Sequence, residues 1–390
     1  MTSVLTLNSG SSSIKFAIYH HDGSFECGLS GTLDGIGSGK TGFTFQDPNG
    51  SEPCRRELAQ LAHLDAAIFL LDWLENHGHM SSLNAIGHRV VHGMNHTEPE
   101  RVTPELLKDL HGITLYDPEH LPKELELIEA FQKRFPNLPQ FACFDTAFHR
   151  NIPRMASMLP IPRHYEAKGI RRYGFHGLSY EYLVQELTRL GDPAATSGRM
   201  ILAHLGNGAS MAAVRNGKSI DTSMGFTPAG GLVMGTRSGD LDPGLLSFLA
   251  RNAAMTPQEF DTMVNHESGL LGMSETSSDI RDLLASAPHD VRAEEAIALF
   301  CYQAKKWIGS FAAALGGLDT LVFSGGIGGN SPAIRQRICA GLDFSGILLN
   351  QTSNEQGAPL ISNDRSRVAV RVIHTNEEII IAQSVCRLLE

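Results

Sequence analysis

Residues 5–18 read LTLNSGSSSIKFAI, and this stretch decides how the rest of the chain is interpreted. An apolar run leads into a polar turn with Asn8, a glycine and three serines, and a second apolar run follows Lys15. This pattern predicts two strands joined by a short turn. The turn is either an ordinary polar hairpin or a cradle for an anion, with Lys15 as a point cation and Ser11 to Ser13 as hydrogen-bond donors.

Residues 201–214, ILAHLGNGASMAAV, repeat the same plan of apolar strand, glycine-containing polar turn and apolar strand. A repeated supersecondary unit indicates a duplicated domain with one hairpin in each half; the alternative is a chance likeness between two hairpins. Elsewhere strand-like runs alternate with helix-like stretches, which predicts α/β layers. One of these stretches, residues 294–315, is apolar on more than one face, so we expect a buried helix there.

A third glycine-rich segment, FSGGIGGNS at 323–331, follows a strand-like run and precedes a helix-like one. A glycine-rich turn from strand to helix puts backbone N–H groups and a helix N-terminus beside a bound phosphate. The segment matches neither the P-loop nor the dinucleotide-binding fingerprint. We therefore expect the two hairpins and this turn to face each other across a cleft between two similar domains and to clamp a triphosphate.

Composition narrows the choice of partners. The length of 390 residues predicts two or three domains, and the net charge of −10 argues against nucleic acid or an anionic membrane as the main partner. An anionic ligand would have to meet a local cluster of cations. The six cysteines are scattered without a C-x-x-C pair, which argues against a disulfide framework or a zinc site. With no signal-peptide pattern and no run of about 18 apolar residues, we expect a cytoplasmic protein.

Candidate cations lie in segments flanked by glycine or histidine. Arg89 stands in GHRVVHG and Arg237 in GTRSGD. Guanidinium groups bind carboxylate and phosphoryl oxygens through two parallel hydrogen bonds, although a single arginine is as readily a surface ion-pair partner. His176 in YGFHGLS and His204 in AHLGNG have no closely spaced zinc-ligand pattern around them, so hydrogen bonding to phosphoryl oxygens is the better functional interpretation.

Candidate carboxylates follow two further strand-like runs. Asp145 comes directly after an apolar strand, which is a usual position for a catalytic acid in α/β folds. Glu377 and Glu378 follow another strand, and carboxylates opposite a phosphate cradle suit Mg²⁺, a hard ion that prefers oxygen ligands. The alternative for the glutamate pair is stabilisation of a helix N-terminus.

Taken together, these segments resemble the acetate kinase family, within the superfamily of sugar kinases, chaperone ATPases and actin. The resemblance runs nearly from end to end, and its most specific signal is DTSMGFTP followed closely by MGTRSGDLDP. It implies an α/β fold of two domains with duplicated ribonuclease H-like (actin-like ATPase) cores and an active site in the interdomain cleft. The N-terminal domain would comprise 1–146 plus 376–390, and the nucleotide-binding domain 147–375. A homodimer is implied.

The resemblance also implies roles for individual residues. It assigns catalysis to Asp145, Arg89, Arg237 and His176, with Arg89 and Arg237 holding the acyl carboxylate and the transferring phosphoryl group. It assigns substrate binding to Arg89, Val91, His120, Phe175 and Pro228, metal binding to Asn8 and Glu377, and nucleotide binding to Lys15, Ser13, His204, Asn207, Gly208, Asp279, Arg281, Gly326, Ile327 and Asn330.

The implied activity is reversible in-line phosphoryl transfer from ATP to acetate with Mg²⁺, or Mn²⁺ in its place, and without nucleic acid or membrane partners. Two alternatives stay open: a kinase for propionate or butyrate, and an ATP-dependent clamp that transfers no phosphoryl group. The chain departs from the family pattern at two positions. Glu119 in PEHLP replaces an apolar residue expected beside the acid's methyl group, and Gly329 in GIGGN replaces a glutamate.

Overall fold

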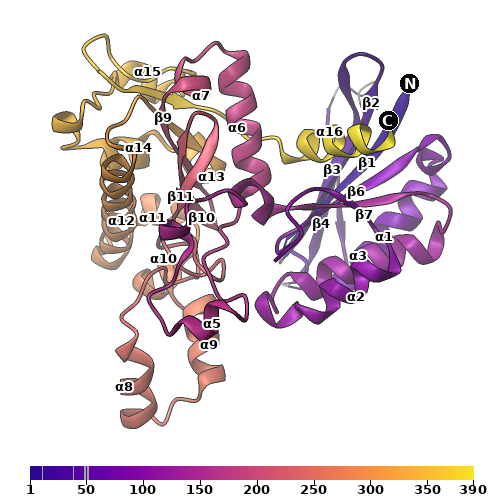
Figure 1. The fold of residues 1–390 in the computed structure, drawn as a ribbon, viewed down its shortest axis with the longest axis horizontal. Coiled ribbons are helices and arrows are strands. Elements are labelled where there is room, and N and C mark those ends of the chain that lie inside the picture. Colours follow the sequence, from indigo (N-terminus) through magenta and orange to yellow (C-terminus); the bar gives the residue numbers. More distant parts are fainter. Residues whose placement is uncertain (11, 38, 48–49, 51) are drawn as a thin grey trace. The chain divides into compact units, whose positions relative to one another are not determined.

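The structure, a computed structural model, describes residues 1–10, 12–37, 39–47, 50 and 52–390 (Figure 1). Ser11, one of the predicted anion donors, lies outside the described residues. The chain forms two compact units, Met1–Ala147 with Asn376–Glu390, and Phe148–Thr375. Within the described residues, no helix combines the length and the apolar character needed to cross a membrane.

The first unit is built on an eight-stranded sheet in the order β5-β4-β3-β2-β1-β6-β8-β7. Strands β1, β2 and β3 are antiparallel neighbours, whereas β6 runs parallel to β1 and β8 runs parallel to β6. The strands are β1 Thr2–Ser9, β2 Ser13–His21, β3 Phe25–Asp34, β4 Thr41–Gln46, β5 Cys54–Leu58, β6 Ala85–Val90, β7 Glu100–Arg101 and β8 Gln140–Phe144.

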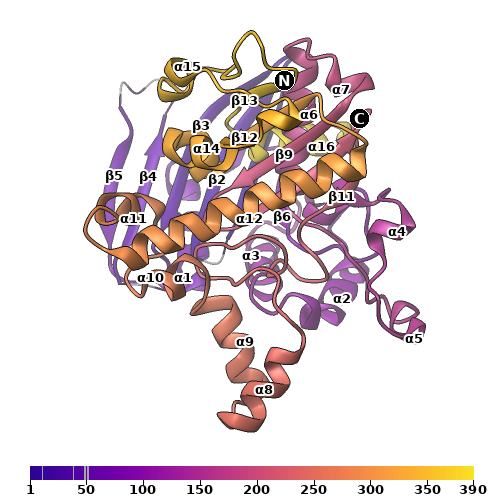
Figure 2. The same cartoon turned by 90° about the vertical axis from the view of Figure 1, so that its left-hand side faces the viewer.

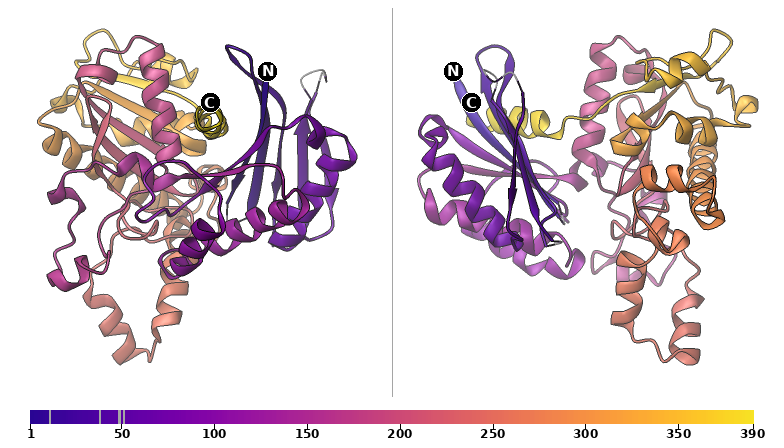
Figure 3. Two further views of the ribbon diagram at one scale, coloured as in Figure 1. Left: turned by 45° about the vertical axis from the view of Figure 1, so that its right-hand side comes forward. Right: turned by 180° about the vertical axis from the view of Figure 1, so that it is seen from behind.

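Helices cover both faces of this sheet (Figure 3). Alternate residues of β2 point to opposite faces, so Phe16 packs with the core that includes α1 and α3, while Ala17 and Tyr19 pack with Ala382 of α16. The last helix of the chain therefore completes the sheet formed by the first residues. The helices are α1 His63–Asn76, α2 Pro104–Gly112, α3 Leu121–Arg134 and α16 Glu377–Leu389.

The second unit contains a five-stranded sheet in the order β11-β10-β9-β12-β13. Again three strands are antiparallel, β9, β10 and β11, and the next two, β12 and β13, run parallel to β9. This is the order and direction of β3-β2-β1-β6-β8, so the two units share one core topology, as the repeated hairpin predicted. The strands are β9 Arg199–Leu205, β10 Ala209–Arg215, β11 Lys218–Thr222, β12 Thr320–Ser324 and β13 Ala369–Val372.

Helix α12 (Val291–Leu315) lies against β9 and β10 of the second unit (Figure 2). It begins after the cap Asp290 and ends before Gly316, whose left-handed φ of 71° stops the helix. The expectation that this helix is buried on several faces is wrong: its buried residues follow one face at helical spacing, and Tyr302 on the other side is 59% exposed. Helix α6, with Tyr180 and Leu183, packs into a separate core cluster with β9 and β10 residues.

The remaining helices of the second unit are mostly short. They are α4 Arg154–Ser157, α5 Arg163–Glu166, α6 Gly177–Arg189, α7 Ala194–Ser197, α8 Gly244–Asn252, α9 Pro257–His266, α10 Gly269–Ser274, α11 Ile280–Ser286, α12 Val291–Leu315, α13 Gly325–Asn330, α14 Pro332–Cys339 and α15 Gln351–Glu355. One prediction is corrected here: residues 325–330, expected as a turn, form the short helix α13.

Candidate active site

Arg89 and Asp145 form a buried ion pair in the first unit. Arg89 is near the end of β6 and Asp145 directly follows β8, and the ends of neighbouring parallel strands lie at one sheet edge. Arg89 Nη2 and Nε donate to Asp145 Oδ2 at 2.6 and 3.0 Å, and Nη1 donates to the backbone oxygen of Ser9 at 3.2 Å. Burial lowers the pKa of Arg89, but Asp145, Glu377 and Glu124 outweigh it and hold that pKa above its ordinary value. The guanidinium is a fixed cation.

Asn8, Glu377 and Glu378 meet beside this pair. Asn8 Nδ2 donates to Glu377 Oε2 at 2.8 Å and to Glu378 Oε1 at 3.2 Å, which links the end of β1 to the first turn of α16. Among the described residues no group of three or more His, Cys, Asp or Glu is arranged to hold a metal ion. The two carboxylates nevertheless offer oxygens of the kind that suit Mg²⁺, which binds through few protein groups and takes its other oxygens from water and phosphate, and the Asn8 side chain orients them.

The predicted hairpin residues lie on the same unit. Lys15 stands directly opposite Asn8 in the antiparallel register of β1 and β2, so both side chains lie on one face. Lys15 is exposed, and the carbonyl of Ser13 accepts from the backbone of Gly10 at 2.8 Å, which closes the turn. The hairpin thus presents an accessible ammonium group beside the amide of Asn8.

Of the predicted acid-binding residues in the first unit, Val91 is buried and His120 is partly buried. Val91 is 3% exposed, and the ring of His120 is held by Asp117, with Nδ1 2.9 Å from Oδ1. Glu119, the departure from the family pattern, is half-buried. Phe175 and Pro228, which the resemblance assigns to the same acid, belong to the second unit.

Sequence reasoning missed Glu124 on α3. Its side chain is 2% exposed, Oε2 accepts from the Val91 N–H at 3.0 Å, and Oε1 has no hydrogen-bond partner in the described part of the chain. Burial raises the pKa of this carboxyl to about 8, against the opposing attraction of Arg89. A signal was available, because Glu124 has helical spacing with the apolar positions Leu121 and Ile128, where a charge is unusual.

His176 occupies a constrained position in the second unit. It precedes α6 with φ 60° and ψ 27°, a left-handed conformation that few residues other than glycine adopt. Its Nδ1 lies 2.8 Å from Ser210 Oγ, which also hydrogen-bonds the hydroxyl of Tyr180, and its ring stacks on His204 at 4.3 Å. Ser210 and His204 are paired across β9 and β10. Sequence reasoning singled out neither Ser210 nor Tyr180.

Arg237 approaches the same hairpin. A Cβ built on Gly208 would lie 3.5 Å from His176 Nε2 and 3.8 Å from Arg237 Nη1, so both nitrogens lie close to the turn between β9 and β10. Arg237 Nη1 also donates to the carbonyl of Pro228 at 3.4 Å. Two side-chain nitrogens close to a glycine-containing turn suit an anion such as a phosphoryl group.

His149 holds the residue before His176 through a hydrogen bond to the backbone of Phe175. Its Nε2 lies 3.1 Å from the carbonyl of Phe175 and its Nδ1 2.8 Å from Ser219 Oγ. A carbonyl only accepts, so Nε2 carries the proton and Nδ1 accepts from the serine. Burial lowers the pKa of His149 to about 4, which keeps the ring neutral at physiological pH.

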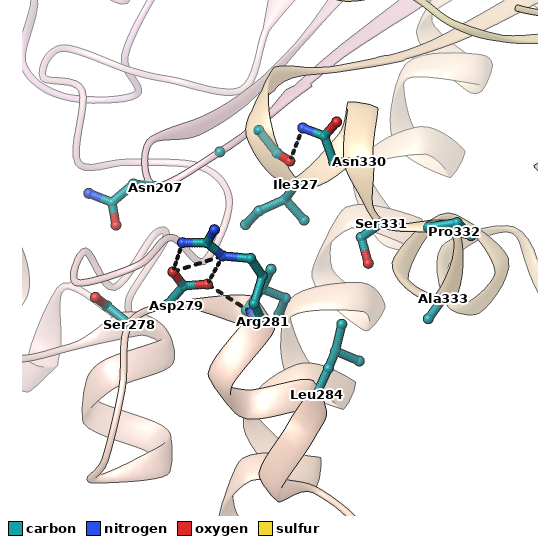
Figure 4. A pocket seen from close by; sticks show the side chains of 13 residues that line it. Asn207, Ser278, Asp279, Arg281, Leu284, Ile327, Asn330, Ser331, Pro332 and Ala333 are labelled. Atoms are coloured by element: carbon teal, nitrogen blue, oxygen red, sulfur yellow. Dashed lines mark hydrogen bonds and ion pairs between the residues drawn. The ribbon is translucent and has the colours of Figure 1, made fainter. Parts of the chain in front are cut away.

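A cavity of about 870 Å³ lies beside the β9–β10 turn (Figure 4). Ile327 and Leu284 contribute apolar side chains to its walls, and the Asp279 carboxylate there accepts hydrogen bonds from the Arg281 guanidinium. Six residues predicted for the nucleotide line it, together with seven that sequence reasoning did not assign. The lining residues are Gly206, Asn207, Ser278, Asp279, Ile280, Arg281, Leu284, Gly326, Ile327, Asn330, Ser331, Pro332 and Ala333.

The glycine helix α13 forms one wall of this cavity and is held from behind by Arg335. That side chain is 0% exposed; Nη1 donates to the carbonyls of Gly328 and Gly329 at 2.9 and 3.0 Å, and Nε and Nη2 donate to Asn354. At the start of the helix, Gly325 has φ 76°, and a Cβ there would lie 2.5 Å from the Leu205 carbonyl. Only glycine fits at this junction.

Comparisons with known proteins agree with this geometry. The acetokinase family matches residues 3–383. An acetate kinase of Rhodopseudomonas palustris is 44% identical over 99% of this chain and 98% of its own length, and a propionate kinase of Citrobacter rodentium is 41% identical over 99% and 96%. The crystal structure of Porphyromonas gingivalis acetate kinase has a TM-score of 0.88 at 35% identity over 100% of both chains. These likenesses confirm the predicted two-domain actin-like ATPase fold, and the chain belongs to the acetokinase family.

Proposed function

We propose that this protein is an acetate kinase, which reversibly transfers the γ-phosphoryl group of ATP to acetate and yields acetyl phosphate and ADP. The observation that carries the proposal is the approach of His176 Nε2 and Arg237 Nη1 to Gly208, beside the cavity of the second unit. A nucleotide bound in that cavity would bring its phosphate chain to these donors. Membership of the acetokinase family supports the same activity.

In the proposed reaction a carboxylate oxygen of acetate attacks the γ-phosphorus in line with the leaving group. The new O–P bond forms as the bond from the γ-phosphorus to the β–γ bridging oxygen breaks, and the electron pair stays on ADP. Acetate is already deprotonated at pH 7, so no general base is needed. Catalysis then consists of positioning and charge stabilisation.

Each side chain has a distinct role in this proposal. Arg89, oriented by Asp145, holds the acyl carboxylate, while Arg237 and His176 donate to the equatorial oxygens of the transferring group. Because Asp145 accepts two hydrogen bonds from Arg89, it orients the guanidinium rather than taking a proton. Asn8, Glu377 and Glu378 would hold Mg²⁺, which would neutralise phosphate charge.

The nucleotide would be held mainly by the second unit, which corresponds in the proposal to the nucleotide-binding domain. His204, Asn207 and Gly208 would bind phosphates, and the apolar side of the cavity would accept the base. Lys15 and Ser13 of the first unit would add charge and hydrogen bonds to the phosphate chain.

A propionate kinase is the second candidate, since relatives of that name are 36–41% identical to this chain. One extra methylene is worth roughly 1–3 kcal/mol in a hydrophobic pocket, which a few side-chain contacts decide. A clamp that hydrolyses ATP without transfer is the remaining alternative.

The test is to trap acyl phosphate as the hydroxamate with ATP, Mg²⁺ and acetate, propionate or butyrate. We expect acetate to give the highest kcat/KM; a higher value for propionate would replace the first candidate by the second. ADP release that ignores every acid would overturn both. Arg237→Ala should lower kcat by the equivalent of roughly 3–4 kcal/mol, as for loss of an oxyanion donor, whereas exposed Arg251→Ala should behave as wild type.

We also propose a cytoplasmic location and a homodimer. All six cysteines lie within the described residues and are free thiols, which supports a reducing compartment. The dimer rests on the family resemblance alone, and sedimentation velocity would test it.

A further inference from the structure

His176 is connected through Ser210 to Tyr180 by two hydrogen bonds. Ser210 and Tyr180 are both 0% exposed, so bulk solvent does not reach these groups. His176 and Tyr180 lie one helical turn apart, since the Tyr180 N–H donates to the His176 carbonyl at 3.1 Å, and Ser210 of β10 bridges their side chains. The three groups form a row that ends at the imidazole.

The direction of the protons along this row follows from the chemistry of the hydroxyls. A phenol is a better donor and a poorer acceptor than an aliphatic alcohol, because its oxygen lone pair is delocalised into the ring. Tyr180 therefore donates to Ser210, and Ser210 donates to Nδ1 of His176. Nδ1 then accepts a hydrogen bond, and in the neutral form of the ring the single proton is on Nε2.

We propose that Ser210 and Tyr180 are positioning residues that fix His176 in the tautomer with the proton on Nε2. This nitrogen is the one that lies near Gly208 and the guanidinium of Arg237. As a donor it can hydrogen-bond a phosphoryl oxygen, whereas the other tautomer would present a lone pair to an anion. The inference rests on the proposed function for the identity of that anion, but the tautomer itself does not.

The left-handed backbone conformation of His176 supports the same inference. A non-glycine residue in this conformation is strained and persists only where surrounding contacts hold it. Two contacts that hold the ring are the hydrogen bond to Ser210 and the stacking on His204. These contacts therefore hold Nε2 in place, and the hydroxyls of Ser210 and Tyr180 determine that Nε2 bears the proton.

The kinetic test compares Ser210→Ala, Tyr180→Phe and their combinations with His176→Ala. We expect Ser210→Ala to lower kcat about 10–100-fold, somewhat less than loss of a whole oxyanion donor, with KM for ATP and acetate within about twofold. In the His176→Ala background, Ser210→Ala should not lower kcat any further. Tyr180→Phe should show the same pattern with a smaller loss. Thr320→Val, which removes another buried hydroxyl of this unit, is the control and should keep wild-type kcat.

A spectroscopic test does not depend on turnover. In protein labelled with ¹⁵N-histidine, the signals missing in His176→Gln identify this ring, and their ¹⁵N shifts report which nitrogen is protonated. The proton should be on Nε2 in the wild type and distributed over both nitrogens in Ser210→Ala. A proton on Nδ1 in the wild type, or additive kinetic losses, would overturn the inference. If acyl transfer is absent but the Nε2 tautomer is found, the proposed function fails and the positioning role stands.

Discussion

Replacing Glu124 by glutamine should change how the stability of the first unit depends on pH. In the unfolded chain this carboxyl ionises near its ordinary pKa of 4.5, but in the folded protein burial raises the pKa to about 8. Between these values the folded state holds more protons than the unfolded state, so stability falls as pH rises and levels off above pH 8. Each pH unit costs about 1.4 kcal/mol, which amounts to about 5 kcal/mol in total.

Glutamine keeps the acceptor for the Val91 N–H but does not ionise. The free energy of unfolding of Glu124→Gln, relative to wild type, should therefore rise by up to about 5 kcal/mol between pH 5 and pH 9. Trp73 lies in the core of the first unit, so its fluorescence in a Trp307→Phe background reports urea unfolding of that unit. Exposed Glu126 on the same helix provides the control, Glu126→Gln.

The result that would refute this reasoning is a difference between Glu124→Gln and wild type that stays constant within about 1 kcal/mol across this range. Such a result would mean that the carboxyl ionises in the folded protein nearly as it does in water. Burial with a single N–H donor would then cost far less than expected for a charge removed from water.

Three further substitutions test the second unit and the acid pocket. Gly325→Ala should lower the melting temperature of the second unit by roughly 4–8 °C, because the left-handed backbone and the clash with the Leu205 carbonyl together cost about 2 kcal/mol or more. The control is Gly309→Ala on α12, where an added Cβ meets no atom within 4 Å, and it should not lower the melting temperature. Arg335→Met removes the donors to the carbonyls of Gly328, Gly329 and Asn354, so calorimetry should show a free energy of unfolding lower by at least about 3 kcal/mol. The KM for ATP should rise in this variant, while the KM for acetate should not. Glu119→Leu should lower the KM for acetate; an unchanged value would show that the carboxylate does not face the substrate.

The sequence predicted the strands of the two cores because they are continuous apolar runs next to distinctive turns. Strands β1, β2, β9 and β10 all follow this rule. Strand β3, FECGLSGTLD, was not predicted, since it is partly exposed and contains two glycines, which weakens the alternating pattern. Helix α13 was expected as a turn because four glycines and one asparagine among its six residues normally disfavour a helix; here Arg335 of the next helix donates hydrogen bonds to its carbonyls.

Parts of the candidate site were predicted where short motifs carry the chemistry, as with Arg89, Asp145 and six of the residues that line the cavity. Long-range partners could not be predicted in this way. Ser210 is buried and lies 34 positions from His176, and nothing in its local sequence distinguishes it from a structural serine. Glu124 could have been found, since a charged residue on the apolar face of an amphipathic helix is visible in the sequence.

The hydrogen bond between Asn8 and Glu377 joins positions 369 residues apart, and the sheet of the first unit is covered on one face by the last helix of the chain. During synthesis on the ribosome, Ala17 and Tyr19 of β2 therefore stay uncovered until α16 has emerged. The second unit, whose sequence is continuous, can fold in that interval. A chain that stops before α16 would lack Glu377 and Glu378, and Asn8 would lose both of these hydrogen-bond partners.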